Sequence, residues 1–244
     1  MSSKILIIIP TYIEETNISI LIPRIFNHLD NVDILIVDDN SSDQTCRKIQ
    51  KFQEKYANLY LIMRAKKMGV ASAYIEGYKW GLARDYKYLG QMDADLSHRV
   101  RDLKNLIFIV ENHKNVSLVI GSRWVLNGGT ENWPMRRSLL SKLGNKYIKF
   151  MFSLKVHDTT AGFRIYSSKV LRKIDFSSLK SQGFSFQIEM LRKIMHLNGE
   201  IREIPIIFRE RQYGKSKITL EIILEAYTYV TKAGLKNKLK NCIQ

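Results

Sequence analysis

The sequence of 244 residues predicts a doubly wound α/β fold, in which a mostly parallel sheet is flanked by helices. Two observations predict it. Short β-branched apolar runs alternate with segments of helical periodicity from residue 4 to residue 120, and polar clusters follow several of those runs. The composition, 45% hydrophobic and 25% charged, is ordinary for a globular protein and excludes a disordered or collagen-like chain.

The apolar runs are continuous rather than alternating, which is typical of strands that are buried on both faces of a sheet. They predict strands at residues 4–9, 32–37, 59–63, 88–92 and 116–120. Between them, apolar residues at helical spacing predict helices at residues 14–29, 45–56, 71–85 and 102–112.

The pattern loosens after residue 120. Gly128 and Gly129 predict a turn, and the later segments predict helices at 134–152, 170–174 and 186–197 and a strand at 201–209. No repeat or low-complexity linker divides the chain, so we expect one domain over residues 1–220 and a basic amphipathic helix or tail over residues 221–244. No apolar run approaches the roughly 20 residues of a membrane-spanning helix, so no transmembrane helix or signal peptide is expected.

Charge and cysteine content narrow the class of protein. Lys and Arg number 39 and Asp and Glu 23, a net charge of +16, which points to an anionic partner such as a nucleic acid, an acidic membrane or a phosphorylated substrate. The plainer explanation of this positive charge is that it keeps the protein soluble. Cys46 and Cys242 lie far apart, which excludes a disulfide framework and a cysteine-type zinc site and suits a reducing compartment.

Polar loops follow four of the predicted strands, at residues 10–14, 38–43, 93–97 and 121–124. The carboxyl ends of parallel strands lie at one edge of a sheet, and folds of this class bind ligands outside that edge. The four loops therefore predict a single site.

Asp93 and Asp95 end the fourth predicted strand, where two carboxylates can reach one hard divalent cation. An Asp-x-Asp pair by itself is more often a turn or a helix cap, but its place among the other polar loops favours Mg²⁺ or Mn²⁺ shared with substrate phosphates. The dinucleotide fingerprint, the P-loop and the serine nucleophile elbow are absent, and the five histidines lack metal-ligand spacing.

The second half of the chain supplies cations of the kind that bind phosphate. They are Arg123, Arg136, Arg137, Arg211, Lys215 and Lys217. A basic loop by itself is as often a solvent-exposed loop without a ligand as it is a phosphate-binding loop. Carboxylates and cations together suggest that two phosphorylated groups meet at one site.

Segments 10–14, 37–43, 92–98 and 121–124 resemble the inverting family 2 glycosyltransferases, which have a GT-A fold with a Rossmann-like sheet. Segments 132–137, 158–164, 186–190 and 211–217 narrow the resemblance to the polyprenyl-phosphate (dolichyl-phosphate) mannosyltransferases. The resemblance covers residues 4–220, and the later segments, in order and at proper spacing, are its more specific part.

The resemblance implies transfer of mannose from GDP-mannose to a polyprenyl or dolichyl monophosphate with inversion, giving a β-mannosyl phosphoryl lipid for glycosylation pathways. It implies a divalent cation, Mg²⁺ or Mn²⁺, at Asp93 and Asp95, with Ser97 as a third ligand directly or through water. It implies that Asp93, Asp95, Arg211 and Lys217 are catalytic.

The resemblance also implies roles in substrate binding. The residues that would hold the guanosine of the donor are Pro10, Tyr12, Glu14, Val37 and Asp39. Those that would meet its diphosphate are Asp93, Ala94, Asp95, Arg123, Arg211 and Lys217. Arg123, Arg136 and Arg137 would bind the acceptor phosphate, and Gln187 and Glu189 would face the sugar. The chain departs from the family at Ile13, where Asn is usual and a bracing hydrogen bond is expected to be missing, and at Ser97, where some members have Gln.

Residues 133–155 hold six Lys or Arg and no acid, interleaved with apolar and aromatic residues, and residues 231–244 add four Lys. This pattern predicts contact with a membrane interface, alone or with a small membrane-embedded partner subunit. The plainer alternative is that Leu140, Leu143 and Ile148 pack on the sheet with the lysines in water. We expect a peripheral protein on the cytoplasmic face of the endoplasmic reticulum in a eukaryote, or of the plasma membrane in a prokaryote.

Three alternatives remain open. A sister enzyme would use another sugar nucleotide, such as UDP-glucose, on the same lipid phosphate. A nucleic-acid-binding protein would account for the positive charge, but the acidic motifs at the strand ends and the lack of a nucleic-acid motif argue against it. An inactive scaffold would explain the departures at Ile13 and Ser97, but the retained Asp93, Asp95, Arg211 and Lys217 argue against that.

Overall fold

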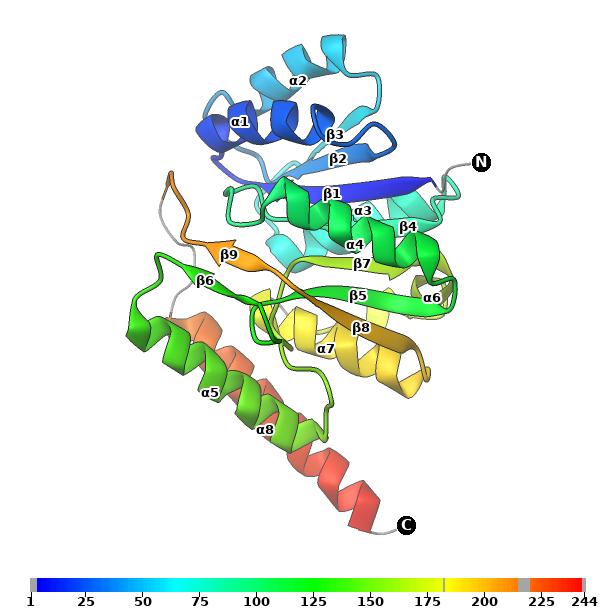
Figure 1. Ribbon diagram of the computed structural model, residues 1–244, viewed down its shortest axis with the longest axis vertical. Coiled ribbons are helices and arrows are strands. Elements are labelled where there is room, and N and C mark those ends of the chain that lie inside the picture. Colours follow the sequence, from blue (N-terminus) through cyan, green and yellow to red (C-terminus); the bar gives the residue numbers. More distant parts are fainter. Residues whose placement is uncertain (1–3, 182, 215–219, 243–244) are drawn as a thin grey trace.

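The computed structural model describes residues 4–181, 183–214 and 220–242. A seven-stranded sheet in the order β3-β2-β1-β4-β7-β5-β8 forms its centre (Figure 1). The strands are β1 (Ile5–Thr11), β2 (Asp33–Asp38), β3 (Leu59–Met63), β4 (Tyr88–Gln91), β5 (Val116–Ser122), β7 (Arg164–Ser167) and β8 (Glu200–Pro205). Among these strands β7 alone runs antiparallel to its neighbours, β4 and β5. The predicted α/β fold with a mostly parallel sheet is confirmed.

Helices cover both faces because each inner strand is apolar on both sides. Ile5, Ile7 and Ile9 of β1 pack with α1 (Glu15–Phe26), α2 (Thr45–Lys55) and α4 (Val100–Asn112). Leu6 and Ile8 of the same strand pack in the opposite layer, which contains α3 (Val70–Leu82), α6 (Ser168–Leu171) and α7 (Gly183–His196). This period of two is what an extended strand between two helical layers requires.

Two long helices, α5 (Met135–Phe152) and α8 (Leu220–Cys242), lie side by side at the β8 end of the molecule (Figure 1). The rings of Tyr147 and Tyr227 stack with centroids 5.4 Å apart, and the hydroxyls of Tyr147 and Thr231 are 2.8 Å apart. Arg192 of α7 donates to the hydroxyl of Tyr229, so α8 is also tied to the layer below the sheet. Helix α8 is therefore packed on the domain at these contacts. Within residues 4–181, 183–214 and 220–242, no helix has both the length and the apolar character needed to cross a membrane.

The strands and helices predicted up to residue 120 are confirmed with small shifts of their ends. Later predictions need correction. The strand predicted at 201–209 is broken at Ile206 into β8 and β9 (Ile207–Arg209), and β9 pairs in a separate two-stranded sheet with β6 (Gly129–Glu131). Strand β6 begins where a turn was predicted at Gly128 and Gly129, and the helix predicted at 170–174 is the single turn α6. Strand β7 and the short 3₁₀ helix η1 (Phe176–Ser178) were not predicted.

Two helical glycines give opposite expectations for stability. A Cβ on Gly77 of α3 would lie 2.6 Å from the Cγ2 of Ile8, which is wholly buried in β1, so Gly77→Ala overpacks the core. Nothing lies within 4 Å of a Cβ on Gly144 of α5, so Gly144→Ala only gains helix propensity. We expect Gly77→Ala to lower the free energy of unfolding by about 1–3 kcal/mol and Gly144→Ala to raise it by about 0.5–1 kcal/mol. Urea unfolding measures both, and equal effects would contradict the packing described here.

Candidate functional site

The loops after β1, β2 and β4 meet at the carboxyl edge of the sheet, as predicted. Thr11 donates from its hydroxyl to Asp38 at 2.7 Å, and the main-chain N–H of Asp39 donates to the carbonyl of Thr11. On the other side, the N–H of Arg209 donates to the carbonyl of Ser97 at 3.1 Å. Arg211 links the two sides, because its guanidinium donates to Asp95 in the loop after β4 and lies 4.0 Å from Glu14 after β1.

Of the residues expected to hold a nucleoside, Tyr12 lies at the edge of the sheet, whereas Val37 and Asp39 are buried. Tyr12 lies beside Lys67, whose ammonium is 4.1 Å from the ring centroid, at the rim of the edge. Val37 is wholly buried in the core, and its expected contact with the guanosine stays a prediction. Asp39 is 6% exposed and forms an ion pair with Arg64. The carboxylate of Asp39 also accepts the main-chain N–H groups of residues 68 and 69. Its role in the structure is therefore to hold the loop after β3 in place.

Ile13 adopts a strained backbone conformation with φ of 55°. Such a positive φ is rare for a β-branched residue and is tolerated mainly at sites whose surroundings enforce it. The enforcing contact is a hydrogen bond from the Ile13 N–H to the hydroxyl of Ser41 at 2.8 Å. Ser41 in turn donates to Asp38. The bond to Ser41 comes from the main chain of residue 13, so it does not replace the side-chain bond that Asn would make.

Asp93 and Asp95 both face the edge, but their surroundings differ. The hydroxyl of Tyr74 donates to Asp93 Oδ1 at 3.3 Å. The side chain of Asp93 is 39% exposed, but the partial loss of water around the carboxylate, and after it the charge of Asp95, raises the pKa of Asp93 above its ordinary value. Burial would also raise the pKa of Asp95, but the side chain of Ser97 and the guanidinium of Arg211, which donates to it at 2.8 Å, outweigh burial and lower the pKa. The main-chain N–H of Ser97 also donates to Asp95 Oδ1 at 3.1 Å. Asp95 is thus held as a carboxylate.

Arg211 places positive charge at the centre of the site. Its guanidinium donates to Asp95 Oδ2 at 2.8 Å and lies 4.0 Å from Glu14 Oε1. Glu14 is buried and accepts a hydrogen bond from Asn17, whose amide is also 3.5 Å from the carbonyl of Tyr213. Glu14 therefore secures the segment that carries Arg211. Lys217, expected beside it, lies outside the described residues.

The residues present fit a divalent cation that shares its ligands with a substrate. Among the described residues no group of three or more acidic, His or Cys side chains could hold a metal ion unaided. Two carboxylates completed by diphosphate oxygens and water are nevertheless a usual arrangement for Mg²⁺. A Cβ on Gly162 would lie 3.7 Å from Asp93 Oδ2, so the glycine leaves that oxygen uncovered. The visible contact of Ser97 is its N–H bond to Asp95, and its role as a ligand stays a prediction.

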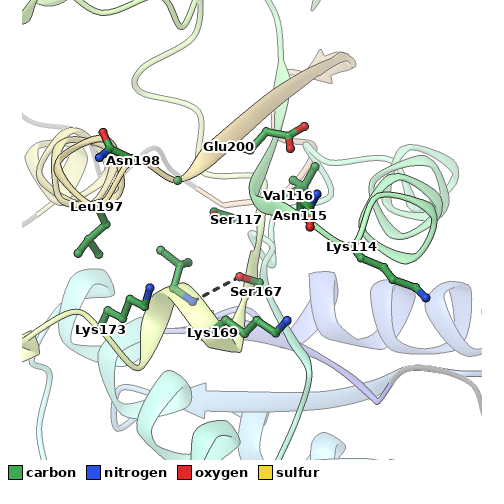
Figure 2. A pocket seen from close by; sticks show the side chains of 12 residues that line it. Lys114, Asn115, Val116, Ser117, Ser167, Lys169, Lys173, Leu197, Asn198 and Glu200 are labelled. Atoms are coloured by element: carbon green, nitrogen blue, oxygen red, sulfur yellow. Dashed lines mark hydrogen bonds between the residues drawn. The ribbon is translucent and has the colours of Figure 1, made fainter.

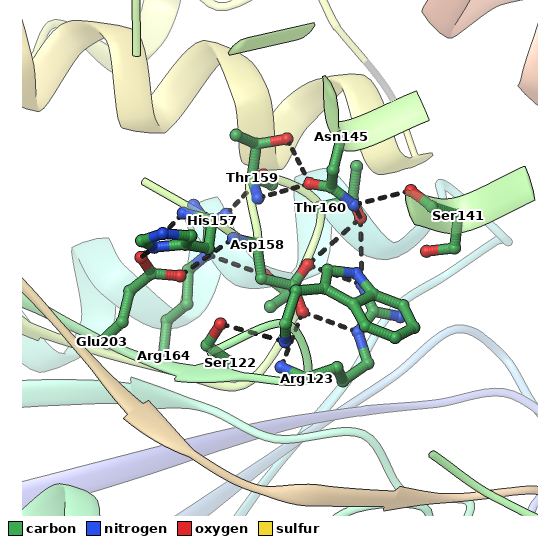
Figure 3. A network of polar contacts seen from close by, with 12 residues as sticks. Ser122, Arg123, Ser141, Asn145, His157, Asp158, Thr159, Thr160, Arg164 and Glu203 are labelled. Carbon is green, nitrogen blue, oxygen red and sulfur yellow. Dashed lines mark hydrogen bonds and ion pairs between the residues drawn. The ribbon is translucent and has the colours of Figure 1, made fainter. Parts of the chain in front are cut away.

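Arg123 belongs to a buried polar network (Figure 3). Its Nε and Nη2 donate to Asp158 Oδ2 and Oδ1, both at 2.7 Å, and its main-chain N–H donates to the same carboxylate at 2.9 Å. Asp158 is wholly buried and Arg123 is 7% exposed. Arg123 was expected to meet phosphates, which stays a prediction, and in the structure its Nε and Nη2 are engaged in this internal ion pair.

The remaining predicted residues lie around this network. Arg136 is exposed at the start of α5, while Arg137 pairs with Glu210 and stacks over Trp133 at 4.0 Å. Gln187 is buried on α7, and its Oε1 has no hydrogen-bond partner in the described part of the chain. Glu189 accepts the main-chain N–H groups of residues 180 and 181, so the structure shows it holding a loop.

Four residues that shape the site were not predicted from the sequence. They are Tyr74, Asn145, Asp158 and Glu203. Asn145 occupies the position three residues before Ile148 on the buried face of α5, and a polar residue at such a position is a signal that the sequence does contain. Glu203 accepts the N–H groups of residues 157 and 158, which lie 46 and 45 residues before it in sequence, and no local pattern reveals such a contact.

A cavity of about 390 Å³ opens at the opposite edge of the sheet, where β5 and β8 begin (Figure 2). Its walls include Lys114, Ser117, Lys169, Lys173 and Glu200. None of the predicted site residues lines it. The convergence of loops, rather than the size of a cavity, identifies the candidate site.

The comparisons with known proteins show the family of this chain. The sequence profile described as glycosyl transferase family 2 matches residues 6–175. A polyprenol monophosphomannose synthase of Mycolicibacterium smegmatis is 38% identical over 98% of this chain and 89% of its own length. An undecaprenyl-phosphate mannosyltransferase of Micrococcus luteus is 38% identical over 95% and 94% of the two chains.

Solved structures show the fold. A glucosyl-3-phosphoglycerate synthase from Mycobacterium tuberculosis, solved with Mn²⁺, UDP-glucose and phosphoglyceric acid, superposes with a TM-score of 0.68. It is 15% identical, and the match covers 94% of this chain and 80% of that one. The likeness bears out the predicted GT-A fold.

The ion pair at Asp158 yields a stability prediction. Asp158→Asn leaves the buried Arg123 without its counter-charge, so we expect the free energy of unfolding to fall by about 3–5 kcal/mol. Asp85→Asn is the matched control, because the pair between Asp85 and Arg172 joins side chains that are 93% and 51% exposed. Its loss costs about 0–1 kcal/mol. Comparable losses in chemical denaturation would show that the buried pair has no special weight.

Proposed function

The chain belongs to glycosyl transferase family 2, and we propose that it transfers mannose from GDP-mannose to a polyprenyl or dolichyl monophosphate. The observation that carries the proposal is the meeting of Asp93, Asp95 and Arg211 at the carboxyl edge of the sheet. The two relatives named as lipid-phosphate mannosyl enzymes, each 38% identical over nearly the whole chain, support this substrate class.

In the proposed mechanism the donor loses a nucleoside diphosphate, whose departing charge must be neutralised. Asp93 and Asp95 would hold Mg²⁺ or Mn²⁺, which supplies Lewis-acid stabilisation of the diphosphate when bound. Arg211, 2.8 Å from Asp95, would place a fixed positive charge beside the same oxygens. Lys217 would add a second cation. Asp95, with its lowered pKa, stays ionised at neutral pH and keeps this arrangement of charge intact.

The acceptor needs little activation. A phosphate monoester has a second pKa of about 6 and carries roughly −1.5 to −2 charge at neutral pH, so it is already a nucleophile. We therefore assign no general base and attribute the rate to positioning and electrostatics. Attack at the sugar C1 opposite the leaving diphosphate inverts that centre and gives a β-linked product. Arg136 and Arg137, at the start of α5, would hold the acceptor phosphate, with Arg123 beside them.

The sister activity with UDP-glucose is the second candidate. The structural neighbour solved with UDP-glucose shares the fold, but 15% identity carries no inference about the sugar. The relatives at 38% identity favour mannose.

We also propose that α5 and α8 rest on the cytoplasmic face of a membrane. Ile148, Met151 and Phe152 of α5 pack inward, whereas Leu140 and Leu143 are 61% and 53% exposed, contrary to the plainer alternative for those two residues. Other large apolar side chains exposed on the two helices are Met135, Leu139, Phe150, Leu224, Tyr227 and Leu235. Basic residues described on the same helices are Arg136, Lys142, Lys146, Lys149, Lys232 and Lys236. Exposed apolar side chains interleaved with cations suit an anionic interface. The membrane would be the endoplasmic reticulum in a eukaryote and the plasma membrane in a prokaryote.

The activity is tested with labelled GDP-mannose and a short polyprenyl phosphate, with Mg²⁺ or Mn²⁺ and with EDTA. We expect cation-dependent transfer that Asp95→Asn lowers at least about 100-fold, because a charge at the reacting diphosphate is lost. The control Asp85→Asn, at the opposite edge, leaves the rate unchanged. Transfer from UDP-glucose alone would replace the donor, and an α-linked product would overturn the inverting mechanism. No transfer to any lipid phosphate would overturn the function.

Membrane contact is tested by co-sedimentation with vesicles that contain phosphatidylglycerol. We expect the double variant Leu140→Gln/Leu143→Gln to bind several-fold more weakly, because apolar area buried in the interface drives such binding. Phe108→Gln on α4 is the control, since Phe108 is 61% exposed on a different helix. Equal binding by the two variants would place the contact elsewhere. Binding unaffected by salt would contradict the role of the basic residues.

A further inference from the structure

Asp93 is the more accessible carboxylate of the pair, yet it is fixed from several directions. Its side chain is 39% exposed, against 15% for Asp95. Mg²⁺ requires near-ideal geometry at about 2.0–2.1 Å from its ligands. An exposed carboxylate can meet that requirement only if neighbouring groups restrict its rotation and its main chain.

Tyr74 restricts the rotation of the carboxylate. It lies on the inner face of α3, is 1% exposed and donates its hydroxyl to Asp93 Oδ1 at 3.3 Å. Its ring stacks on Phe186 of α7 with centroids 6.4 Å apart and planes inclined by only 7°. Because the ring is locked by packing, the hydroxyl is a fixed donor. Oδ2 accepts no hydrogen bond from the described residues and is the oxygen left for a cation.

His98 restricts the main chain of the same residue. Its Nδ1 accepts the N–H of Asp93 at 3.1 Å, so the proton of the neutral ring resides on Nε2. Nε2 lies 3.8 Å from Asp93 Oδ2, which is too far for a hydrogen bond. The ring is 3% exposed, stacks on Phe163 with centroids 4.4 Å apart and meets the edge of Phe208. It has no room to rotate away from this acceptor role.

Gly162 keeps the accessible face of the carboxylate open. The backbone there lies outside the left-handed region, so conformation does not require glycine. A Cβ would stand 3.7 Å from Oδ2 and 3.8 Å from Oδ1, where it would border the space that a cation and its water ligands need. The three neighbours thus share one consequence, an Asp93 Oδ2 that is fixed and uncovered.

We propose that Tyr74 and His98 are positioning residues for Asp93, which turn its Oδ2 toward a divalent cation. Tyr74 sets the rotation of the carboxylate, and His98 sets the main chain that carries it. The inference rests on the proposed function, because it assumes that a cation binds beside the donor diphosphate. Hydrogen-bond partners of metal ligands typically change metal affinity by about 10–100-fold when removed.

The test is Mn²⁺ binding to the full chain with and without GDP, followed by electron paramagnetic resonance. We expect Tyr74→Phe to weaken Mn²⁺ binding by about 10-fold or more. In the transfer assay the same variant raises the Mn²⁺ concentration for half-maximal rate and keeps most of kcat at saturating Mn²⁺. Tyr78→Phe is the matched control, because Tyr78 is wholly buried one turn away and its hydroxyl has no hydrogen-bond partner in the described part of the chain.

Two substitutions separate the acceptor role of His98 from its packing. His98→Asn keeps an acceptor near the position of Nδ1, whereas His98→Leu fills the space without one. We expect His98→Asn to retain more Mn²⁺ affinity than His98→Leu. Equal affinities in that pair, or wild-type affinity in Tyr74→Phe, would overturn the positioning role while leaving the proposed function standing. A wild-type chain that binds GDP but no Mn²⁺ would overturn both the cation and the inference.

Discussion

The buried ion pair between Arg123 and Asp158 is the contact on which the candidate site at the carboxyl edge of the sheet depends. Two charged groups can be buried together only when hydrogen bonds, to each other and to their neighbours, replace the water that each of them loses. Three donors of Arg123 converge on Asp158, and the main-chain N–H of Asp158 is itself held by Glu203. The pair therefore fixes the loop after β5 against the segment that leads into β7, and it joins both to β8.

The fixed segment then determines the surroundings of Asp93. Residues 158–162 run from the ion pair to Gly162, beside the carboxylate. Arg164 supports the same segment from below the sheet, where it is wholly buried and donates to the carbonyls of Thr159, Ala161 and Gln187. A shift of this segment would move the open face of Asp93. The ion pair and the proposed cation site are thus connected through this one segment, although 35 residues separate Arg123 from Asp158.

The sequence predicts well where local pattern and tertiary structure agree. Strands β1 to β5 are continuous apolar runs, and the loops after them reach one edge because parallel strands end there. Strand β7 escaped prediction because it has four residues and begins with Arg164, a charge that becomes acceptable only through carbonyls supplied by other segments. The pairing of Arg123 was equally hidden. In a sequence, an arginine that binds phosphate cannot be told from an arginine that pairs with a buried aspartate. Only the fold shows that Asp158 lies beside Arg123.

Helix α5 connects the surface proposed to meet a membrane with the candidate site at the sheet edge. Its outer face exposes Leu140 and Leu143, while its inner face carries Asn145, which is 3% exposed. The amide of Asn145 accepts the N–H and the hydroxyl of Thr159, each at 2.7 Å, and donates to the carbonyl of Ser141 (Figure 3). The helix proposed to meet the lipid surface is therefore bonded directly to the segment that borders Asp93. In the proposed function a lipid-linked phosphate would be held at the membrane and the sugar donor at the sheet edge, and this rigid link would fix the distance between the two.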